Sequence, residues 1–212
     1  MFVKVCGITN AKDADWAARC GASAIGFVFC SSPRQVAPEK VRVIREELSP
    51  HVLAVGVFTE EPVARIREVA AYCGLDLVQL HGDPSPDICR HVGLPCIRAI
   101  RVRDERSLRS IHDYREAVHA VLLDAWDAER TGATGRVFDW RLASRVRCLG
   151  MPVILAGGLT PGNVGAAVSA VRPHGVDVSS GVEARPGVKD PALVRRFVMQ
   201  ARLRDEREVI RV

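Results

Sequence analysis

The chain of 212 residues lacks any long hydrophobic segment. None of its apolar runs approaches the roughly 18 residues that a membrane-spanning helix needs. Its N-terminus also lacks a basic region followed by an apolar stretch and a small-residue cleavage site, the pattern of a secretory signal. We therefore expect a soluble, cytoplasmic protein that does not interact with a membrane.

The sequence contains no CxxC pair. Its seven cysteines, an odd number, are irregularly spaced at positions 6, 20, 30, 73, 89, 96 and 148. This spacing is typical of neither a disulfide framework nor a zinc site. Reduced thiols are therefore the expectation.

Aromatic residues are scarce, at 5% of the chain, although the formal net charge is +5 and the isoelectric point is near 9.0. A nucleic-acid-binding surface commonly combines clustered basic residues with aromatic side chains. Here the arginines are scattered along predicted helix faces. We expect no nucleic-acid partner, since a small anionic substrate accounts equally well for the positive charge.

Short β-branched runs alternate with helix-like segments along the whole chain, which is typical of a parallel sheet built from βα units. The predicted strands are 2–6, 23–29, 52–57, 76–80, 96–101, 119–124, 152–156 and 175–178. The predicted helices are 11–20, 38–48, 61–73, 84–91, 104–115, 139–148, 161–171 and 190–203.

Eight such units predict an α/β fold, a single-domain (βα)8 TIM barrel over residues 1–212, with 204–212 as a charged helix end or tail. The main rival is a doubly wound open sheet. That fold normally carries GxGxxG after its first strand, whereas this chain has Cys6-Gly7-Ile8-Thr9 there. The barrel is the better interpretation.

In a (βα)8 barrel the chemistry is found at the C-terminal ends of the strands. Cys6 ends the first predicted strand, so its thiol is a candidate acid or base, although a free cysteine is more often a small buried hydrophobe. Side chains alternate along a strand, so Lys4 and Cys6 share one face. Both residues could therefore line the barrel interior.

Two small loops follow strands 7 and 8, where this fold often binds phosphate through backbone N–H groups. Glycine lets the backbone approach an anion closely, and serine adds a hydroxyl donor. These loops predict a phosphate site, and their candidate ligands are Gly157, Gly158, Ser179, Ser180 and Gly181.

Several other polar residues follow strands. Asp124 ends an apolar strand, where partial burial would raise its pKa toward that of a general acid, or where it could be a structural carboxylate. Arg34 could clamp a carboxylate bidentately or lie in solvent. Gln79 and His81 follow strand 4 as candidate substrate contacts, and Asp177 ends strand 8.

Five short segments occur in a fixed order along the chain: Lys4-Val5-Cys6-Gly7-Ile8-Thr9, Gln79-Leu80-His81-Gly82, Leu122-Leu123-Asp124, Gly157-Gly158-Leu159 and Asp177-Val178-Ser179-Ser180-Gly181-Val182-Glu183. Gly26-Phe27-Val28-Phe29 and Phe138-Asp139-Trp140 accompany them. Together these segments resemble the phosphoribosylanthranilate isomerases of tryptophan biosynthesis, and the resemblance extends from Val3 to about Phe197.

The resemblance implies a barrel, monomeric or homodimeric, that uses no metal and no cofactor. Its reaction would be an Amadori rearrangement of the phosphorylated substrate N-(5-phosphoribosyl)anthranilate. Asp124 would be the general acid that opens the ribose ring, and Cys6 the base that takes the proton from C2. Arg34 would bind the anthranilate carboxylate, although the loop 30–34 is about one residue shorter than is usual. Gln79, His81 and Asp177 would also bind substrate.

Two alternatives remain open. The histidine-pathway isomerase, or a dual-substrate relative, performs the same chemistry on a bis-phosphate within the same fold. Those enzymes typically place aspartate where this chain has Cys6. A non-catalytic phosphosugar-binding barrel is the second alternative, and the presence of both Cys6 and Asp124 beside the phosphate loops disfavours it.

Overall fold

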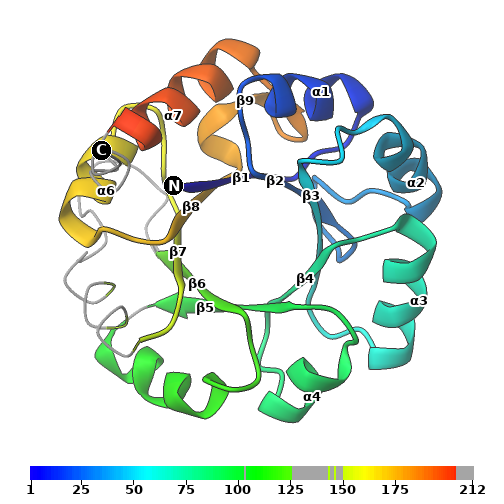
Figure 1. The fold of residues 1–212 in the computed structure, drawn as a ribbon, viewed down its shortest axis with the longest axis vertical. Coiled ribbons are helices and arrows are strands. Elements are labelled where there is room, and N and C mark those ends of the chain that lie inside the picture. The colour runs from blue at the N-terminus through cyan, green and yellow to red at the C-terminus, as the bar shows by residue number, and fades with distance from the viewer. Residues whose placement is uncertain (103, 126–142, 144–145, 147–149, 204–212) are drawn as a thin grey trace, which may run out of the picture.

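The computed structural model describes residues 1–102, 104–125, 143, 146 and 150–203. Eight parallel strands pair in sequence order and close into a barrel, with helices around the outside (Figure 1). This confirms the predicted (βα)8 architecture. The strands are β1 (Phe2–Cys6), β2 (Ala24–Val28), β3 (Leu53–Phe58), β4 (Leu77–Leu80), β5 (Cys96–Val102), β6 (Ala120–Ala125), β7 (Val153–Ala156) and β8 (Gly175–Val178).

Within the described residues, the outer layer consists mostly of α-helices, with two 3₁₀ segments and one short hairpin. The α-helices are α1 (Ala11–Arg19), α2 (Pro38–Glu47), α3 (Val63–Cys73), α4 (Pro86–His91), α6 (Val164–Val171) and α7 (Pro191–Leu203). The 3₁₀ segments are η1 (Glu105–Tyr114) and η2 (Ser180–Val182), and the hairpin pairs β9 (Glu183–Arg185) with β10 (Val188–Lys189).

The two faces of each strand enter different parts of the core, because successive side chains point to opposite sides. Val3 and Val5 of β1 belong to the large apolar cluster between the sheet and the helices. A smaller cluster fills the barrel interior; it comprises Ala24, Val55, Leu77, Ile97, Ala99, Ala120, Leu122, Ile154 and Ala156. Lys4 and Cys6 alternate with Val3 and Val5, so both point inward.

Pairing between the first and last strands closes the barrel. In its register Lys4 lies opposite Asp177, and Phe2 lies opposite Gly175. Gly175 is required here, because a Cβ atom on it would lie 2.8–3.0 Å from Phe2. Closure leaves no free edge on the barrel sheet and brings the two ends of the chain's βα series together.

Most predicted elements are observed within two residues of their expected ends. The predicted helix 104–115 is instead the 3₁₀ segment η1, which begins with a capping box between Asp104 and Ser107. The predicted helix 161–171 begins three residues late, because Thr160 N–H donates to Asn163 Oδ1 and forms a turn there. The β9–β10 hairpin was not predicted.

Some predictions lie outside the described residues. These are the segment Phe138-Asp139-Trp140, the charged end 204–212 and all but Ala143 and Val146 of the predicted helix 139–148. In the described part of the chain, no helix combines the length and apolarity needed to cross a membrane.

Candidate active site

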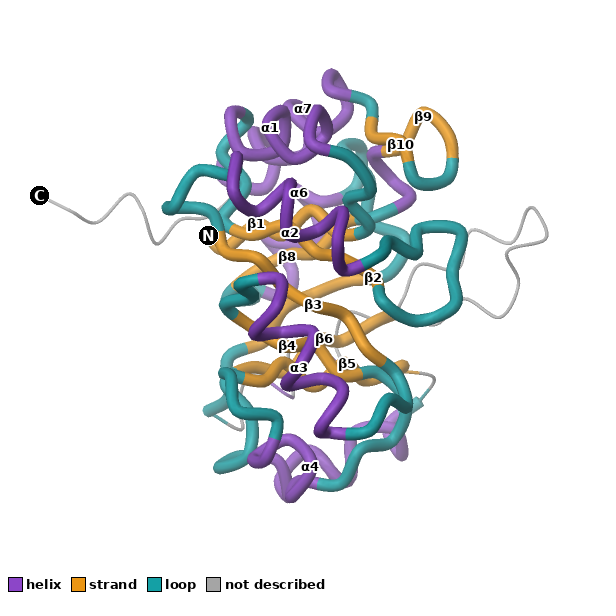
Figure 2. Tube along the Cα trace, turned by 90° about the vertical axis from the view of Figure 1, so that its right-hand side faces the viewer, coloured by secondary structure: helices purple, strands orange, loops and turns teal. Residues whose placement is uncertain are grey.

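The candidate residues gather at the C-terminal ends of the barrel strands. In Figure 2 the β9–β10 hairpin lies on the side of the barrel away from the N-terminus, which is the side to which the parallel strands run. Val36 N–H donates to the Val28 carbonyl, so the loop after β2 folds back over the end of its own strand. Chain segments far apart in sequence therefore surround this end of the barrel.

Cys6 and Lys4 lie side by side above Gly26 of the neighbouring strand. A Cβ atom at position 26 would lie 2.7 Å from Cys6 Sγ and 3.1 Å from Lys4 Nζ. The missing side chain of Gly26 therefore gives the thiol and the ammonium group their space. Lys4 is fully buried, and its Nζ donates to Asp177 Oδ1 at 3.0 Å.

Burial and charge act in opposite directions on this cluster. Burial raises the pKa of the Cys6 thiol, and the Lys4 ammonium group partly offsets that effect. Burial alone would lower the pKa of Lys4, but the Asp177 and Cys6 charges outweigh it, so the pKa of Lys4 is raised. Lys4 therefore stays cationic beside a thiol whose anion it stabilises.

Gln79 and His81 form a polar pair at the end of β4. Gln79 Nε2 lies 2.8 Å from His81 Nε2. Burial, with added repulsion from Lys4, Arg101 and Arg98, lowers the pKa of His81 to about 4, so its ring is neutral and can accept this hydrogen bond. Gln79 Oε1 is buried with no hydrogen-bond partner in the described residues, which leaves an acceptor for a ligand hydroxyl.

The two predicted phosphate loops contact each other directly. Gly157 and Gly158 both have positive φ, and a Cβ atom on Gly158 would meet nothing within 4 Å, so the backbone there faces open space. In contrast, a Cβ atom on Gly181 would lie 1.9 Å from the Leu159 carbonyl oxygen. The loops after β7 and β8 thus pack backbone to backbone, which only glycine at 181 permits.

Two further side chains support this region. Asn163 Nδ2 donates to the Gly158 carbonyl at 3.0 Å and so fixes the loop after β7. Ser179 Oγ is buried with no hydrogen-bond partner among the described residues and lies close to Gly7, where it is available to a ligand. Ser180 begins η2, directly beside it.

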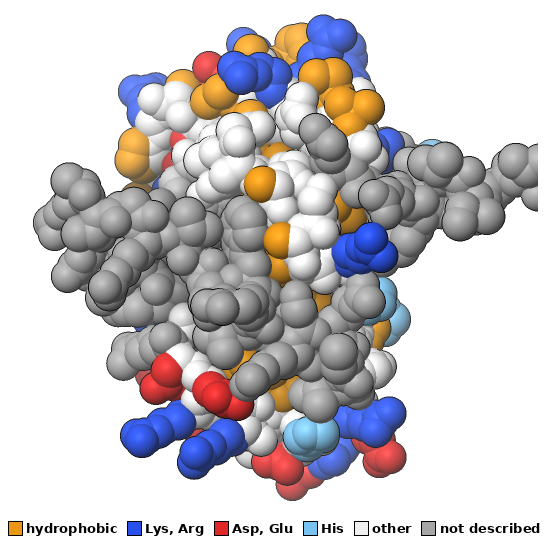
Figure 3. Space-filling view, turned by 90° about the vertical axis from the view of Figure 1, so that its left-hand side faces the viewer, with side chains coloured by type: hydrophobic (Ala, Val, Ile, Leu, Met, Phe, Trp, Pro, Cys, Tyr) orange, Lys and Arg blue, Asp and Glu red, His pale blue; other side chains and the backbone are white. Residues whose placement is uncertain are grey.

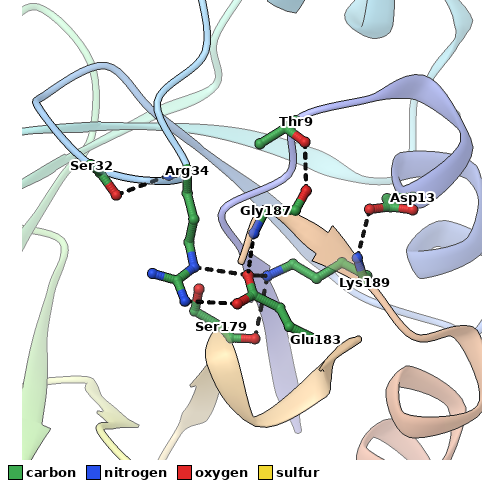
Figure 4. A network of polar contacts seen from close by, with 8 residues as sticks. All are labelled: Thr9, Asp13, Ser32, Arg34, Ser179, Glu183, Gly187 and Lys189. Atoms are coloured by element: carbon green, nitrogen blue, oxygen red, sulfur yellow. Dashed lines mark hydrogen bonds and ion pairs between the residues drawn. The ribbon is translucent and has the colours of Figure 1, made fainter. Parts of the chain in front are cut away.

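Arg34 extends from the loop after β2 and is already paired. Its Nε and Nη2 donate to Glu183 Oε1 and Oε2 at 2.8 and 2.7 Å (Figure 4). Its aliphatic part covers Gly7, since a Cβ atom there would lie 2.5 Å from Arg34 Cδ. Arg34 therefore lies above the residue that follows Cys6.

Asp124 is half-buried and lies near the end of β6, opposite Arg101 of β5 and Ala156 of β7 in the strand register. Leu122, two residues earlier on the same strand, belongs to the interior cluster. By the alternation of the strand, Asp124 points toward the same interior. The carboxyl group thus reaches the end of the barrel where Cys6 and the phosphate loops lie.

Sequence reasoning missed three residues that adjoin the candidate site: Gly26 lies against Cys6 and Lys4, and Glu183 and Lys189 form the ion network around Arg34. Gly26 carried no signal of its own, because its role is to leave space for side chains of another strand. Asp177, a predicted substrate contact, is buried in an ion pair with Lys4, and its contact with substrate stays a prediction. Among the described residues, no group of three or more His, Cys, Asp or Glu side chains could hold a metal ion.

Comparison with protein families agrees with this geometry. Residues 3–200 match the model of the family described as N-(5'-phosphoribosyl)anthranilate (PRA) isomerase. A protein of that name from Pelobacter propionicus is 49% identical over 201 residues, which cover 94% of this chain and 95% of the relative. One from Geobacter metallireducens is 50% identical, covering 94% of this chain and 98% of the relative.

Solved structures show the same similarity. Phosphoribosylanthranilate isomerase from Thermotoga maritima superposes with a TM-score of 0.89 at 42% identity, covering 95% of this chain and 98% of the other. A phosphoribosylanthranilate isomerase in complex with reduced 1-(o-carboxyphenylamino)-1-deoxyribulose 5-phosphate gives a TM-score of 0.86 at 41% identity, with the same coverage of both chains.

Proposed function

Because this chain belongs to the phosphoribosylanthranilate isomerase family, an enzyme family of tryptophan biosynthesis, we propose that Cys6 and Asp124 are its catalytic base and acid. The observation that carries this proposal is the buried Lys4–Asp177 ion pair, which holds a cation beside the Cys6 thiol at the mouth of the barrel. A site of this kind suits proton transfer, because a fixed charge stabilises the thiolate.

The first step opens the ribose ring of N-(5-phosphoribosyl)anthranilate. Asp124 gives its proton to the ring oxygen, the C1–O bond breaks, and the nitrogen lone pair forms a C1=N double bond. The product of this step is a cationic Schiff base. Its positive charge acidifies the C–H bond at the adjacent C2.

Cys6 then removes the C2 proton as a thiolate. The electron pair of that bond moves between C2 and C1 and neutralises the nitrogen, which gives an enolamine. Cys6 then returns its proton to C1, and the C2 hydroxyl gives its proton to the Asp124 carboxylate, which yields the ketone. Both residues regain their starting protonation, so atoms and charge balance over the reaction. Burial raises the pKa of Cys6, and the positive charges of Lys4 and of the Schiff base oppose that effect and favour the thiolate.

Substrate binding uses the remaining residues. The loops with Gly157, Gly158 and Ser179–Gly181 take the phosphate, and Arg34 takes the anthranilate carboxylate. The free acceptor Gln79 Oε1 suits a ribose hydroxyl, and neutral His81 holds the Gln79 amide in place. Asp177, the last predicted substrate contact, also pairs with Lys4.

The histidine-pathway bis-phosphate is the competing substrate. Turnover of each compound by the purified protein decides between it and N-(5-phosphoribosyl)anthranilate. We expect rapid loss of the fluorescence of N-(5-phosphoribosyl)anthranilate generated in situ, with no comparable turnover of the bis-phosphate. Loss no faster than the spontaneous background, together with turnover of the bis-phosphate, would reverse the assignment. Binding of both without turnover would indicate a non-catalytic barrel.

Replacing Lys4 by methionine tests its role next to the base. Lys4→Met keeps a side chain of similar length but removes the cation that lowers the pKa of Cys6. The base must be deprotonated, so the rising limb of the pH profile of kcat/KM should move to higher pH. Activity near neutrality should fall by about tenfold or more.

Lys40→Met, at an exposed position on α2, is the matched control and should leave the pH profile in place. A Lys4→Met profile that is lower but unshifted would show that Lys4 supports the fold and not the thiolate.

The cellular setting and assembly form part of the same proposal. We propose that the enzyme acts in the cytoplasm, where its thiols stay reduced, and as a monomer or homodimer; a Thermotoga maritima relative is described as dimeric. On the face drawn in Figure 3, basic side chains lie in several separate groups, and acidic side chains lie among them. This distribution suits a solvated surface and a small anionic substrate.

A further inference from the structure

A buried ion network links Arg34 to the β9–β10 hairpin (Figure 4). Glu183 accepts two hydrogen bonds from the Arg34 guanidinium group and one from Lys189 Nζ at 2.8 Å. The side chains of Glu183 and Lys189 are only 4% and 2% exposed. Lys189 also donates to the Ser179 carbonyl, and its own N–H donates to Asp13 Oδ2 of α1 at 2.7 Å. Lys189 thus attaches the network to the loop after β8 through Ser179 and to helix α1 through Asp13.

Glu183 determines which edge of the guanidinium group is available. It occupies Nε and Nη2, and within the described residues Nη1 has no hydrogen-bond partner. An arginine fork can pair with a second carboxylate through its other edge. The backbone N–H of Arg34 donates to Ser32 Oγ, and its Cδ covers Gly7, so the side chain is held at its base as well as at its tip.

The charges of the network suit an anionic ligand. Hydrogen bonds from Arg34 and Lys189 overcome the effect of burial and lower the pKa of Glu183 to about 2, so its carboxylate is ionised throughout the neutral range. Among the three side chains Arg34, Glu183 and Lys189, two cations and one anion leave one net positive charge; in the described part of the chain, the Asp13 carboxylate contacts only the backbone N–H of Lys189. Without Lys189, Glu183 would cancel the charge of Arg34 and repel a second carboxylate.

We propose that Glu183 is a positioning residue for Arg34, fixing the guanidinium group so that its free edge meets the carboxylate on the aromatic ring of the substrate. Lys189 holds Glu183 and restores the net positive charge. This inference rests on the proposed function, in which Arg34 binds that carboxylate. The competing interpretation is that the ion pair only clips the β9–β10 hairpin to the loop after β2.

The test compares two ligands that differ by one group. The first is reduced 1-(o-carboxyphenylamino)-1-deoxyribulose 5-phosphate, and the second is the same compound without the ring carboxylate. Their binding is measured by titration calorimetry on wild type, Glu183→Gln and Glu46→Gln. Glu46 forms an exposed pair with Arg42 on α2, so its variant controls for loss of an arginine–glutamate pair remote from the site.

For Glu183→Gln we expect binding of the carboxylated ligand to weaken about tenfold or more, because loss of the ionised partner frees the guanidinium group. Binding of the ligand without the carboxylate should stay within about twofold, and kcat should fall far less than KM rises. Glu46→Gln should match wild type. If circular dichroism shows that Glu183→Gln does not fold, Glu183→Asp takes its place in the same comparison. Aspartate keeps the negative charge but holds it on a shorter side chain, farther from Arg34.

Equal weakening of both ligands, or no weakening of either, would overturn the positioning role and leave only the structural clip. In an Arg34→Ala background the Glu183 substitution should no longer discriminate between the ligands, and continued discrimination would also contradict the proposal. Failure of the wild type to turn over N-(5-phosphoribosyl)anthranilate is a separate result, which would refute the proposed function and with it the premise of this inference; the comparison of the two ligands tests the role of Glu183 by itself.

Discussion

Cys6→Ser should lower turnover of N-(5-phosphoribosyl)anthranilate by at least about a thousandfold while leaving the barrel folded. Serine preserves the size and polarity of the side chain, but its hydroxyl is far harder to deprotonate than a thiol. The charges of Lys4 and of the Schiff base oppose the burial that raises the pKa of the Cys6 thiol, whereas the same charges leave a serine hydroxyl protonated at neutral pH. The measurement is the rate of substrate fluorescence loss, with circular dichroism as the check on folding.

Cys30→Ser is the matched control. Cys30 packs against Cys6, Val28 and Val57 at the same end of the barrel but lies on the loop after β2, without the contacts to Gly26 and Lys4 that define Cys6. Its variant should retain most of the wild-type rate. Near-normal turnover of Cys6→Ser would exclude the thiol as the base.

Asp124→Asn should also cost at least about a thousandfold in kcat. Asparagine has the same shape but cannot give up a proton to the ring oxygen, so the ribose ring must open without acid assistance. Binding of the reduced product analogue, in which the ring is already open, should change little. Asp15→Asn, on the exposed face of α1, should behave as wild type.

A deuterium label at C2 of the ribose separates the two roles. In Asp124→Asn ring opening becomes rate-limiting, so deuteration should have almost no effect on the rate. In Cys6→Ser removal of the C2 proton is rate-limiting, so deuteration should slow the reaction clearly. The same isotope effect in both variants would contradict the division between acid and base.

The barrel could be predicted from the sequence because its strands are short, apolar and separated by polar helical segments. The first predicted strand, 2–6, coincides with β1, and the last, 175–178, coincides with β8. The predicted secondary structure was wrong where side chains form hydrogen bonds with nearby backbone groups, or where an element is very short. The capping box of Asp104 leads into a 3₁₀ segment, and the β9–β10 hairpin is too short to give a periodic signal.

The site could be predicted only where the position of a residue along its strand determines where its side chain lies. Period two placed Lys4 and Cys6 on one face, and the structure shows both above Gly26. The partner of Arg34 could not be inferred, because Glu183 lies 149 residues away and their contact depends on how two loops fold over the barrel. The space left by Gly26 could not be inferred either, because the side chains that fill it, those of Cys6 and Lys4, belong to another strand.

The Lys4–Asp177 ion pair joins residues that are 173 positions apart. A ribosome makes the chain from its N-terminus, so Lys4 is translated 173 residues before its counter-ion. Until Asp177 follows, the ammonium group of Lys4 has no carboxylate beside it, and the inward face of β1 must stay hydrated. Isomerase activity should therefore appear in a single step, when the eighth strand takes its place beside the first.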